Sequence, residues 1–413
     1  MVEGYFDRLP CDILHNIALM LPFSSIKQLR YSSKFWYNLL TDPKFVDLQL
    51  TQALQKPPGY LFTPITKSWP KKKVCYFVEQ SGGHLSTSKI FEYTYDHNEP
   101  EQFGRFQSSG GLMCAYLRES CYFRIFNPYI GEQVQVPRDS NFKRWRFFSF
   151  IFSYSPSIKE YKILKIGRLY SGPIVGEICT LGSNIWRDLQ DVPSNLWYCD
   201  PHTQCQGNLF WMEEHDLHFF DIVSEKLHVI PGPPVFNRVH VTHYSNTYEK
   251  LMRNSLISMG HTVGYVHNNG LWVLEDKTKG IWMKRYHFSI PSLNEYFNPM
   301  LIGTTDNDHL FGHGECSNVV FSHDMGCTGL RVMELNLGDV DEEQQRRAEF
   351  IAPHVRSFVS PVRIMKMGKM LNDKEKSVLD TLKLDYDATK DDLINRMYEF
   401  LQAYQKNDKS DEL

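Results

Sequence analysis

The sequence has few cysteines, no surplus of charge of either sign and no long apolar run. Nine cysteines in 413 residues, an odd number without a Cys-x-x-Cys pair, exclude a disulfide scaffold. Lys and Arg number 45 against 48 Asp and Glu, whereas a dedicated nucleic-acid binder needs basic surplus to neutralise phosphates. No stretch approaches 18 apolar residues. We therefore expect no nucleic-acid partner and no membrane partner.

The start of the chain lacks the basic leader and unbroken apolar run of a signal peptide, because His15 and Asn16 interrupt it. Its end, Ser410-Asp411-Glu412-Leu413, resembles a variant retrieval signal of the endoplasmic reticulum. Such a signal is read only after entry into that compartment, so we interpret the end as an acidic tail. The expected location is cytoplasmic, nuclear or both.

Aromatic residues make up 14% of the chain, alongside 25 Gly and 21 Pro, a composition that favours short strands and tight turns. Three regions differ in pattern. We expect a compact helical module over residues 5–50, a strand-rich domain over 60–362 and a charged, amphipathic helical tail over 366–413. Two prolines and a glycine at 57–59 mark the first join. The tail helices could pack on the β domain or bind another protein.

The strand-rich region repeats itself. FNPYIGEQVQVP begins at Phe126 and FDIVSEKLHVIP begins at Phe220, while a weaker copy begins at Phe321. Trp186 and Trp282 keep nearly the same step. Each copy is typical of an antiparallel hairpin, and a period of about 95 residues fits two propeller blades of about 47. The fold class predicted is mainly β with α termini, a β-propeller of six or seven blades. A large β-sandwich or two smaller β domains is the alternative.

The first region predicts three short helices. Pro10 can begin the first, in which Ile13, Leu14, Ile17 and Leu21 form an apolar face, and Pro22 ends it. Ser25 with Gln28 has capping-box spacing for a second helix. Ser33 can cap a third, which Asp42-Pro43 stops. So small a module cannot bury enough surface alone, so we expect another protein, the following β domain, or both to cover it.

These residues resemble an F-box. The order Leu9-Pro10, Ile13-Leu14, Ile17, Leu21-Pro22, Leu29, Ser33-Lys34, Trp36, Leu39-Leu40 and Asp42-Pro43 follows the family pattern, although Tyr31-Ser32-Ser33 replaces its usual Cys-rich run. The resemblance implies binding to a small Skp-type adaptor, which links indirectly to a cullin scaffold. The residues it assigns to that contact are Leu9, Pro10, Ile13, Leu14, Ile17, Leu21, Pro22, Leu29, Trp36 and Leu39.

The remainder resembles the F-box-associated, kelch-like domain of plant F-box proteins. Asn127-Pro128 with Gly131-Glu132 and Pro137 matches one signature of that family, and Trp186–Leu189 and His354–Pro361 match later landmarks. The resemblance implies a subunit of a Skp-cullin-F-box (SCF) ubiquitin ligase whose β domain presents a protein substrate for ubiquitination and degradation. It implies no catalysis by this chain, no cofactor and no metal. The substrate cannot be read from the sequence.

Two other functions stay open: a protein-binding module that does not direct degradation, and a propeller enzyme with a histidine-rich site. Cys199, His202 and Cys205 lie within seven residues, but a zinc site needs a fourth ligand. His215 with His218 and His309 with His313 lack a zincin pattern, and we read the latter pair as strand and turn. The segment from Gly260 to Gly264 imitates a nucleophile elbow with Thr262 in place of Ser.

Overall fold

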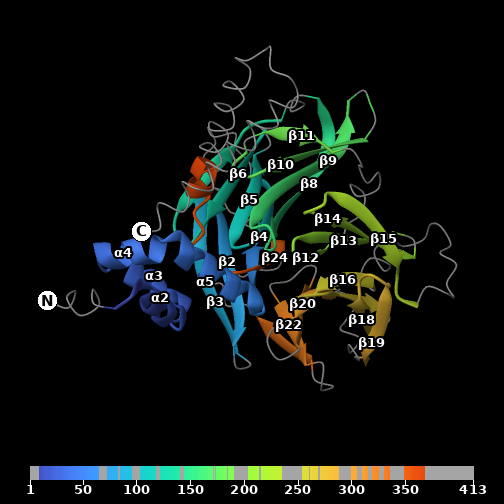
Figure 1. Ribbon diagram of the computed structural model, residues 1–413. Coiled ribbons are helices and arrows are strands. Elements are labelled where there is room, and N and C mark those ends of the chain that lie inside the picture. Colours follow the sequence, from blue (N-terminus) through green and yellow to red (C-terminus); the bar gives the residue numbers. More distant parts are fainter. Residues whose placement is uncertain are drawn as a thin grey trace, which may run out of the picture.

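The computed structural model describes residues 9–64, 72–81, 84–94, 103–117, 121–139, 144–170, 172, 174–183, 185–189, 203–213, 215–234, 254–259, 261–267, 270–287, 299–304, 309–314, 319–324, 330–334 and 348–367. Within these ranges, no helix has the length and apolar character needed to cross a membrane. The predicted tail helices lie outside the described residues, and a short helix that was not predicted spans residues 361–367. Figure 1 shows the helices on one side of a larger β domain.

The described part of the N-terminal region, from residue 9 onward, forms four helices, not the three predicted. They are α2 (Cys11–Leu19), α3 (Phe23–Arg30), α4 (Lys34–Thr41) and α5 (Pro43–Gln55). The Ser33 cap is confirmed, because Trp36 N donates to Ser33 Oγ at 3.3 Å. The Ser25 cap is wrong, since the helix begins two residues earlier, directly after Pro22. Asp42-Pro43 ends α4 but also begins α5, with Asp42 as the capping acceptor and Pro43 in the first turn.

The described strands form five sheets, in which every strand pair but one is antiparallel. The first contains β24 (Ala348–His354), β1 (Gly59–Pro64), β2 (Lys72–Ser81) and β3 (His84–Thr94). The second contains β4 (Phe103–Ser109), β5 (Leu112–Leu117), β6 (Tyr122–Asn127) and β7 (Glu132–Val136). The third contains β8 (Trp145–Ser155), β9 (Glu160–Leu169), β10 (Ile174–Thr180) and β11 (Trp186–Asp188), and the fourth β12 (Thr203–Cys205), β13 (Asn208–Glu213), β14 (Asp216–Asp221) and β15 (Lys226–Pro231).

The fifth sheet has eight strands and consists of two successive meanders. One is β16 (Asn254–Ser258), β17 (Val263–His267), β18 (Gly270–Asp276) and β19 (Ile281–His287); the other is β20 (Pro299–Thr304), β21 (His309–Gly314), β22 (Val319–Asp324) and β23 (Leu330–Glu334). A single parallel pair, Ser258 with Gly303, joins them. The described strands therefore form five sheets but six four-stranded units, because the eight-stranded sheet contains two of these units.

The first strands of the meanders follow one another around a ring. β24 contacts β4, β4 contacts β8, β12 contacts β16, β16 contacts β20, and β20 contacts β24. Between β8 and β12, the Gln204 side chain donates to the Phe152 carbonyl at 3.0 Å. The strand nearest the C-terminus, β24, pairs along β1, so the two ends of the β domain complete one blade. This is a propeller arrangement, and it leaves few free sheet edges.

The internal repeat predicted from the sequence is confirmed. Phe126, Phe220 and Phe321 lie in β6, β14 and β22, the third strands of three alternate meanders. In each case the following strand pairs antiparallel to it, as the hairpin pattern predicted. One hydrogen bond between neighbouring blades also recurs with this two-blade period. Trp186 donates its indole N–H to the Pro137 carbonyl at 2.6 Å, and Trp282 donates to the Pro231 carbonyl at 2.9 Å.

The aromatic-rich strands are buried on both faces because each sheet packs between two others. Along β8, Phe150 and Phe152 join the apolar cluster shared with β5 and β6, while Ile151 points to the cluster shared with β13 and β14. Alternate residues of a strand point to opposite faces, so one run of apolar residues packs against both of the flanking sheets. The core is therefore a series of layers between blades.

Two buried lysines on β9 follow the same alternation. Lys165 pairs with Asp139, which follows β7, at 2.7 Å, and both side chains are at most 2% exposed. Lys162 faces the other neighbour and pairs with Glu225 in the β14–β15 turn at 2.8 Å. Burial lowers the pKa of Lys165, and the Asp139 carboxylate only partly offsets this. Each lysine thus ties its blade to a different neighbour.

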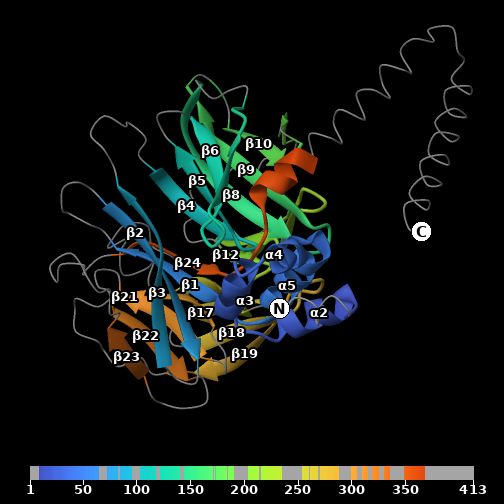
Figure 2. The same ribbon diagram turned by 90° about the vertical axis from the view of Figure 1, so that its left-hand side faces the viewer.

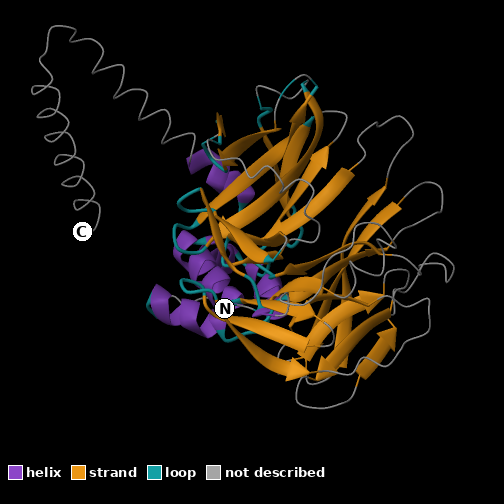
Figure 3. Ribbon diagram, turned by 90° about the vertical axis from the view of Figure 1, so that its right-hand side faces the viewer, coloured by secondary structure: helices purple, strands orange, loops and turns teal. Residues whose placement is uncertain are grey.

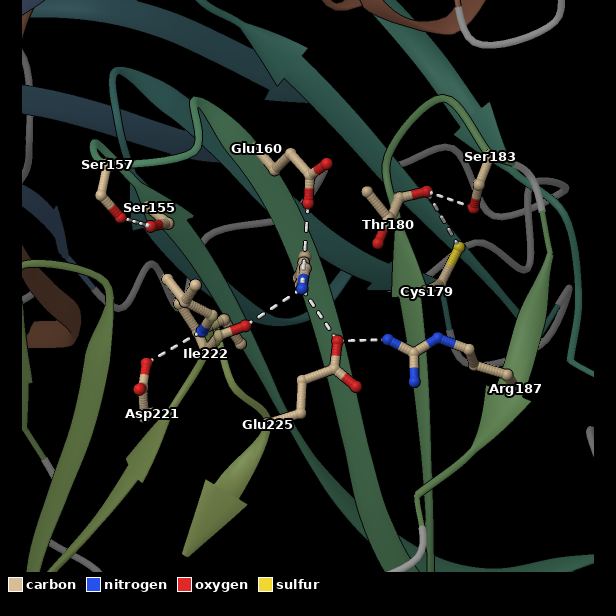
Figure 4. Close-up of polar contacts among 12 residues, drawn as sticks. Ser155, Ser157, Glu160, Cys179, Thr180, Ser183, Arg187, Asp221, Ile222 and Glu225 are labelled. Atoms are coloured by element: carbon tan, nitrogen blue, oxygen red, sulfur yellow. Dashed lines mark hydrogen bonds and ion pairs between the residues drawn. The ribbon is translucent and has the colours of Figure 1, made fainter. Parts of the chain in front are cut away.

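Glu225 also accepts a hydrogen bond from Arg187 on β11, so one carboxylate serves two cations (Figure 4). Burial raises the pKa of Glu225, but the bonds from Arg187 and Lys162 outweigh it and hold the pKa below its ordinary value. The backbone of Glu225 has a φ of +57°, at a turn position where the β6–β7 and β18–β19 turns carry Gly131 and Gly280. A residue with a side chain there accepts backbone strain, and the ion pairs offset it.

Candidate functional site

The helical module has a buried side and an apolar exposed side. Of the residues assigned to adaptor binding, Leu14 and Leu39 are buried, and Leu29 and Trp36 pack against the module's core. Six are exposed: Leu9, Pro10, Ile13, Ile17, Leu21 and Pro22. The structure therefore places six of the ten residues at the surface, in and beside α2, buries Leu14 and Leu39, and leaves Leu29 and Trp36 half-buried.

The exposed side is unusually apolar for a free surface. Ile13 and Ile17 are 45% and 42% exposed, one helical turn apart on α2, and Met20 at its end is 86% exposed. A cluster of exposed apolar side chains of this kind marks a protein interaction site more often than a solvated surface.

The buried side is completed by a segment from the far end of the chain. We call residues 355–360, which follow β24, the strap. Phe358 of the strap is 2% exposed and belongs to the same apolar cluster as Ala18, Ile26, Leu40 and Phe45 of the helices. Its ring stacks on Phe23 with centroids 4.5 Å apart. The packing of the helices on the β domain, one of the two alternatives weighed above, is confirmed for this side.

Hydrogen bonds fix the strap to the helices. The Gln49 side chain of α5 donates to the Arg356 carbonyl at 3.0 Å and accepts from Phe358 N at 3.3 Å. Just beyond the strap, Arg363 donates to the Thr41 carbonyl at the end of α4 at 2.6 Å. In Figure 2, the helices and the segment over 361–367 lie on the same side of the β domain. Figure 3 shows the helices on one side of the molecule and the strands on the other.

The strap is held equally firmly by the β domain. The Asn127 side chain donates to the carbonyls of Ser357 and Val359, both at 2.9 Å, while its own oxygen accepts from Tyr129 N. Ser357 donates to the Gly111 carbonyl at 3.2 Å. Gly111 has a φ of +75°, and a Cβ there would lie 2.2 Å from Ser357 Oγ. Only glycine fits at this crossing.

A half-buried ion pair of the strap lies next to a buried histidine. Arg356 pairs with Glu79 at 2.7 Å and lies over the rings of Phe23 and Phe77, so it links both domains. Next to it, His354 Nδ1 lies 2.6 Å from Ser108 Oγ. Burial, followed by the Arg356 charge, lowers the pKa of His354 to about 3. His354 is therefore neutral at physiological pH.

Two sequence motifs far apart in the chain meet here. Asn127 and Glu132 belong to one motif, and Ser357 and Ser360 belong to the other, yet Asn127 bonds to Ser357 and Glu132 accepts from Ser360. Sequence reasoning found both motifs but missed that they touch, and it missed that Phe358 enters the helical core. Gln49 and Phe358 carried no local signal, because their partners lie about 300 residues away in the sequence.

The histidine-rich alternative gains no support from the described residues, which contain no group of His, Cys, Asp and Glu able to hold a metal. Cys199 and His202 lie outside the described residues. His215 is exposed and His218 lies on β14, while His309 and His313 lie on β21. The nucleophile-elbow interpretation is wrong. Thr262 leads into the strand β17, and its hydroxyl donates to the Leu274 carbonyl at 2.6 Å.

Two family models match the chain. The model described as "F-box domain" matches residues 6–48, and "F-box associated beta propeller domain" matches residues 65–353. The second match covers well over half of the chain. Each match falls on one of the two structural regions that the strap joins.

Curated relatives come from Arabidopsis thaliana. A putative F-box/kelch-repeat protein is 25% identical over 54% of this chain and 58% of its own length. An F-box/LRR-repeat/kelch-repeat protein is 22% identical over 70% of this chain and 78% of its own. An F-box protein is 24% identical over 73% of this chain and 70% of its own. The chain thus spans less than two thirds of the length of the first of these relatives.

Solved structures resemble the chain only distantly. A nidogen/laminin complex is 10% identical with a TM-score of 0.42, covering 72% of this chain and 99% of that one. TolB from Acinetobacter baumannii is 10% identical with a TM-score of 0.40, covering 77% and 69%. Scores this low support no functional inference. The helices, the closed ring of meanders and the two family matches agree, and the chain belongs to the family of F-box proteins with an F-box associated beta propeller domain.

Proposed function

We propose that this protein is the substrate-recognition subunit of a Skp-cullin-F-box ubiquitin ligase. The observation that carries the proposal is the exposed apolar side of α2, which belongs to a matched F-box domain. Ile13, Ile17 and Leu21, together with Leu9 and Pro10, would contact a Skp-type adaptor, and a cullin scaffold would follow indirectly. Leu14, Leu29, Trp36 and Leu39 would support this surface from within.

The propeller would bind the protein substrate. Propellers and other scaffolds recognise partners through the loops that their rigid sheets position. Many connections between the meanders lie outside the described residues, so the structure offers no substrate contact to name. We further propose that the two meanders of the eight-stranded sheet act as separate blades, giving a six-bladed propeller. Catalysis would belong to other subunits, with the complex acting in the cytoplasm, the nucleus or both.

The test is co-purification of a Skp-type adaptor with the full chain. Ile13→Asp with Ile17→Asp places two charges on the exposed side of α2, where burying them against a partner would be costly. We expect adaptor recovery to collapse. Ile185→Asp is the matched control, because Ile185 is 63% exposed on the propeller and should leave recovery unchanged. Undiminished recovery of the double variant would contradict the proposal.

A protein-binding module that does not direct degradation remains the second candidate. This second function would use the adaptor contact or none, so the fate of the bound partner separates it from the first. Proteins that bind the chain are first identified with the proteasome blocked. Their half-lives are then measured with the proteasome active, in the presence of the wild type or of the Ile13→Asp, Ile17→Asp double variant. Longer half-lives with the double variant support the ligase function. Unchanged half-lives favour the second candidate.

A further inference from the structure

A cavity of about 680 Å³ lies where the helical module, the strap and the β domain meet. Its wall is largely apolar and includes Tyr37 of α4, Leu50 of α5, Phe358 of the strap and Ile364 just beyond it. A volume of this size falls within the range of sites for small organic ligands, which are mostly apolar with a few placed polar groups. The cavity therefore has the dimensions and the walls of a ligand site.

One buried cation lines this cavity without a hydrogen-bond partner. Arg30, the last residue of α3, is 5% exposed, and its Nε and one terminal nitrogen have no acceptor among the described residues. The rings of Tyr37 and Phe358 lie 5.3 and 5.9 Å from the guanidinium carbon. Aromatic faces offset only part of the cost of removing a charge from water, and guanidinium groups also need acceptors.

The other charged groups around the cavity already have partners. Lys159 pairs with Asp47 at 2.6 Å, and Lys44 pairs with Asp12 at 2.9 Å. Arg363 donates to the Thr41 carbonyl. The remaining acid, Glu132, accepts from Ser360. Glu132 keeps its negative charge in that hydrogen bond, but no described acid forms an ion pair with Arg30.

We propose that this cavity binds a small organic carboxylate. The carboxylate pairs with the Arg30 guanidinium, whose planar fork suits two carboxylate oxygens. The apolar body of the ligand lies against Tyr37, Phe358 and Ile364. The largely apolar wall favours a ligand with a carbon skeleton over inorganic phosphate. This binding is separate from adaptor docking and does not depend on the proposed function.

The test measures binding to the full chain by calorimetry, with phenylacetate as the probe. Phenylacetamide has nearly the same shape without the charge, and inorganic phosphate has the charge without the apolar body. We expect phenylacetate to bind measurably more tightly than either. Arg30→Gln should weaken phenylacetate binding by at least about tenfold, since hydrogen bonds to charged groups are among the stronger ones. Lys279→Gln removes an exposed cation elsewhere and should change nothing.

Stability of the ligand-free variants separates a binding role from a folding role. Because the Arg30 charge is uncompensated in the free protein, we expect Arg30→Gln to leave the midpoint of thermal unfolding unchanged or raised. Arg30→Lys keeps the charge but not the fork, and should weaken phenylacetate binding less than Arg30→Gln. Equal binding of phenylacetate and phenylacetamide would overturn the proposal. So would a lowered midpoint in Arg30→Gln.

Discussion

The two sides of the helical module are both apolar, but they are covered in different ways. On the inner side, Phe358 of the strap fills the space among Ala18, Ile26 and Phe45 and leaves little exposed. On the outer side, Ile13 and Ile17 stay in contact with solvent. A module of four short helices cannot hide all its apolar residues alone. The difference shows that the chain stabilises its module on one side and leaves the other available for a partner.

Removing the Phe358 side chain, which attaches the strap to the helices, should have the largest effect on stability. Phe358→Ala removes a side chain that is only 2% exposed, and truncations of buried Phe cost about 3–5 kcal/mol. We expect that loss in the free energy of unfolding by denaturant, with α2–α5 losing protection first. Ile17→Ala, on the outer side, should cost less than about 1 kcal/mol because the side chain is already partly solvated. Similar losses in the two variants would contradict the account.

The electrostatics beside the strap predict a pH dependence. The unfolded chain binds a proton at His354 near pH 6.5, whereas the folded protein holds its pKa at about 3. The folded state therefore loses stability as the pH falls below 6.5, by roughly 2–3 kcal/mol between pH 6.5 and 4.5. His354→Gln should reduce this slope in denaturant titrations at several pH values, and the exposed His215→Gln should not. An unchanged slope in His354→Gln would show that His354 is not held neutral.

The smallest effect is expected where the two domains touch at the surface. Lys159 on the propeller pairs with Asp47 of α5, but the two side chains are 62% and 40% exposed. Solvent screens such a pair, so Lys159→Ala should change the free energy of unfolding by less than about 0.5 kcal/mol. Thermal unfolding at low and high salt checks this. A larger loss would mean that surface charge, and not Phe358, holds the module in place.

Local sequence signals predicted the repeating hairpins, because a strand, turn and proline recur at a nearly constant step. One family pattern assigned the exposed residues of α2 to adaptor binding, and that assignment stays a prediction. Local signals failed at α5, since Asp42-Pro43 can end one helix and begin the next with equal ease. They could not find the paired lysines of β9 or the entry of Phe358 into the helices. These depend on partners in other blades and at the far end of the chain, which only the closed ring brings together.

Amide hydrogen exchange of the full chain, with and without a Skp-type adaptor, tests the central claim most directly. It reports on both sides of the module at once. We predict that the adaptor slows exchange in α2 and in the turn that follows it, and leaves exchange in the strap and in Gln49 of α5 unchanged. Slowed exchange in the strap with none in α2 would contradict the claim that the outer side is the docking surface.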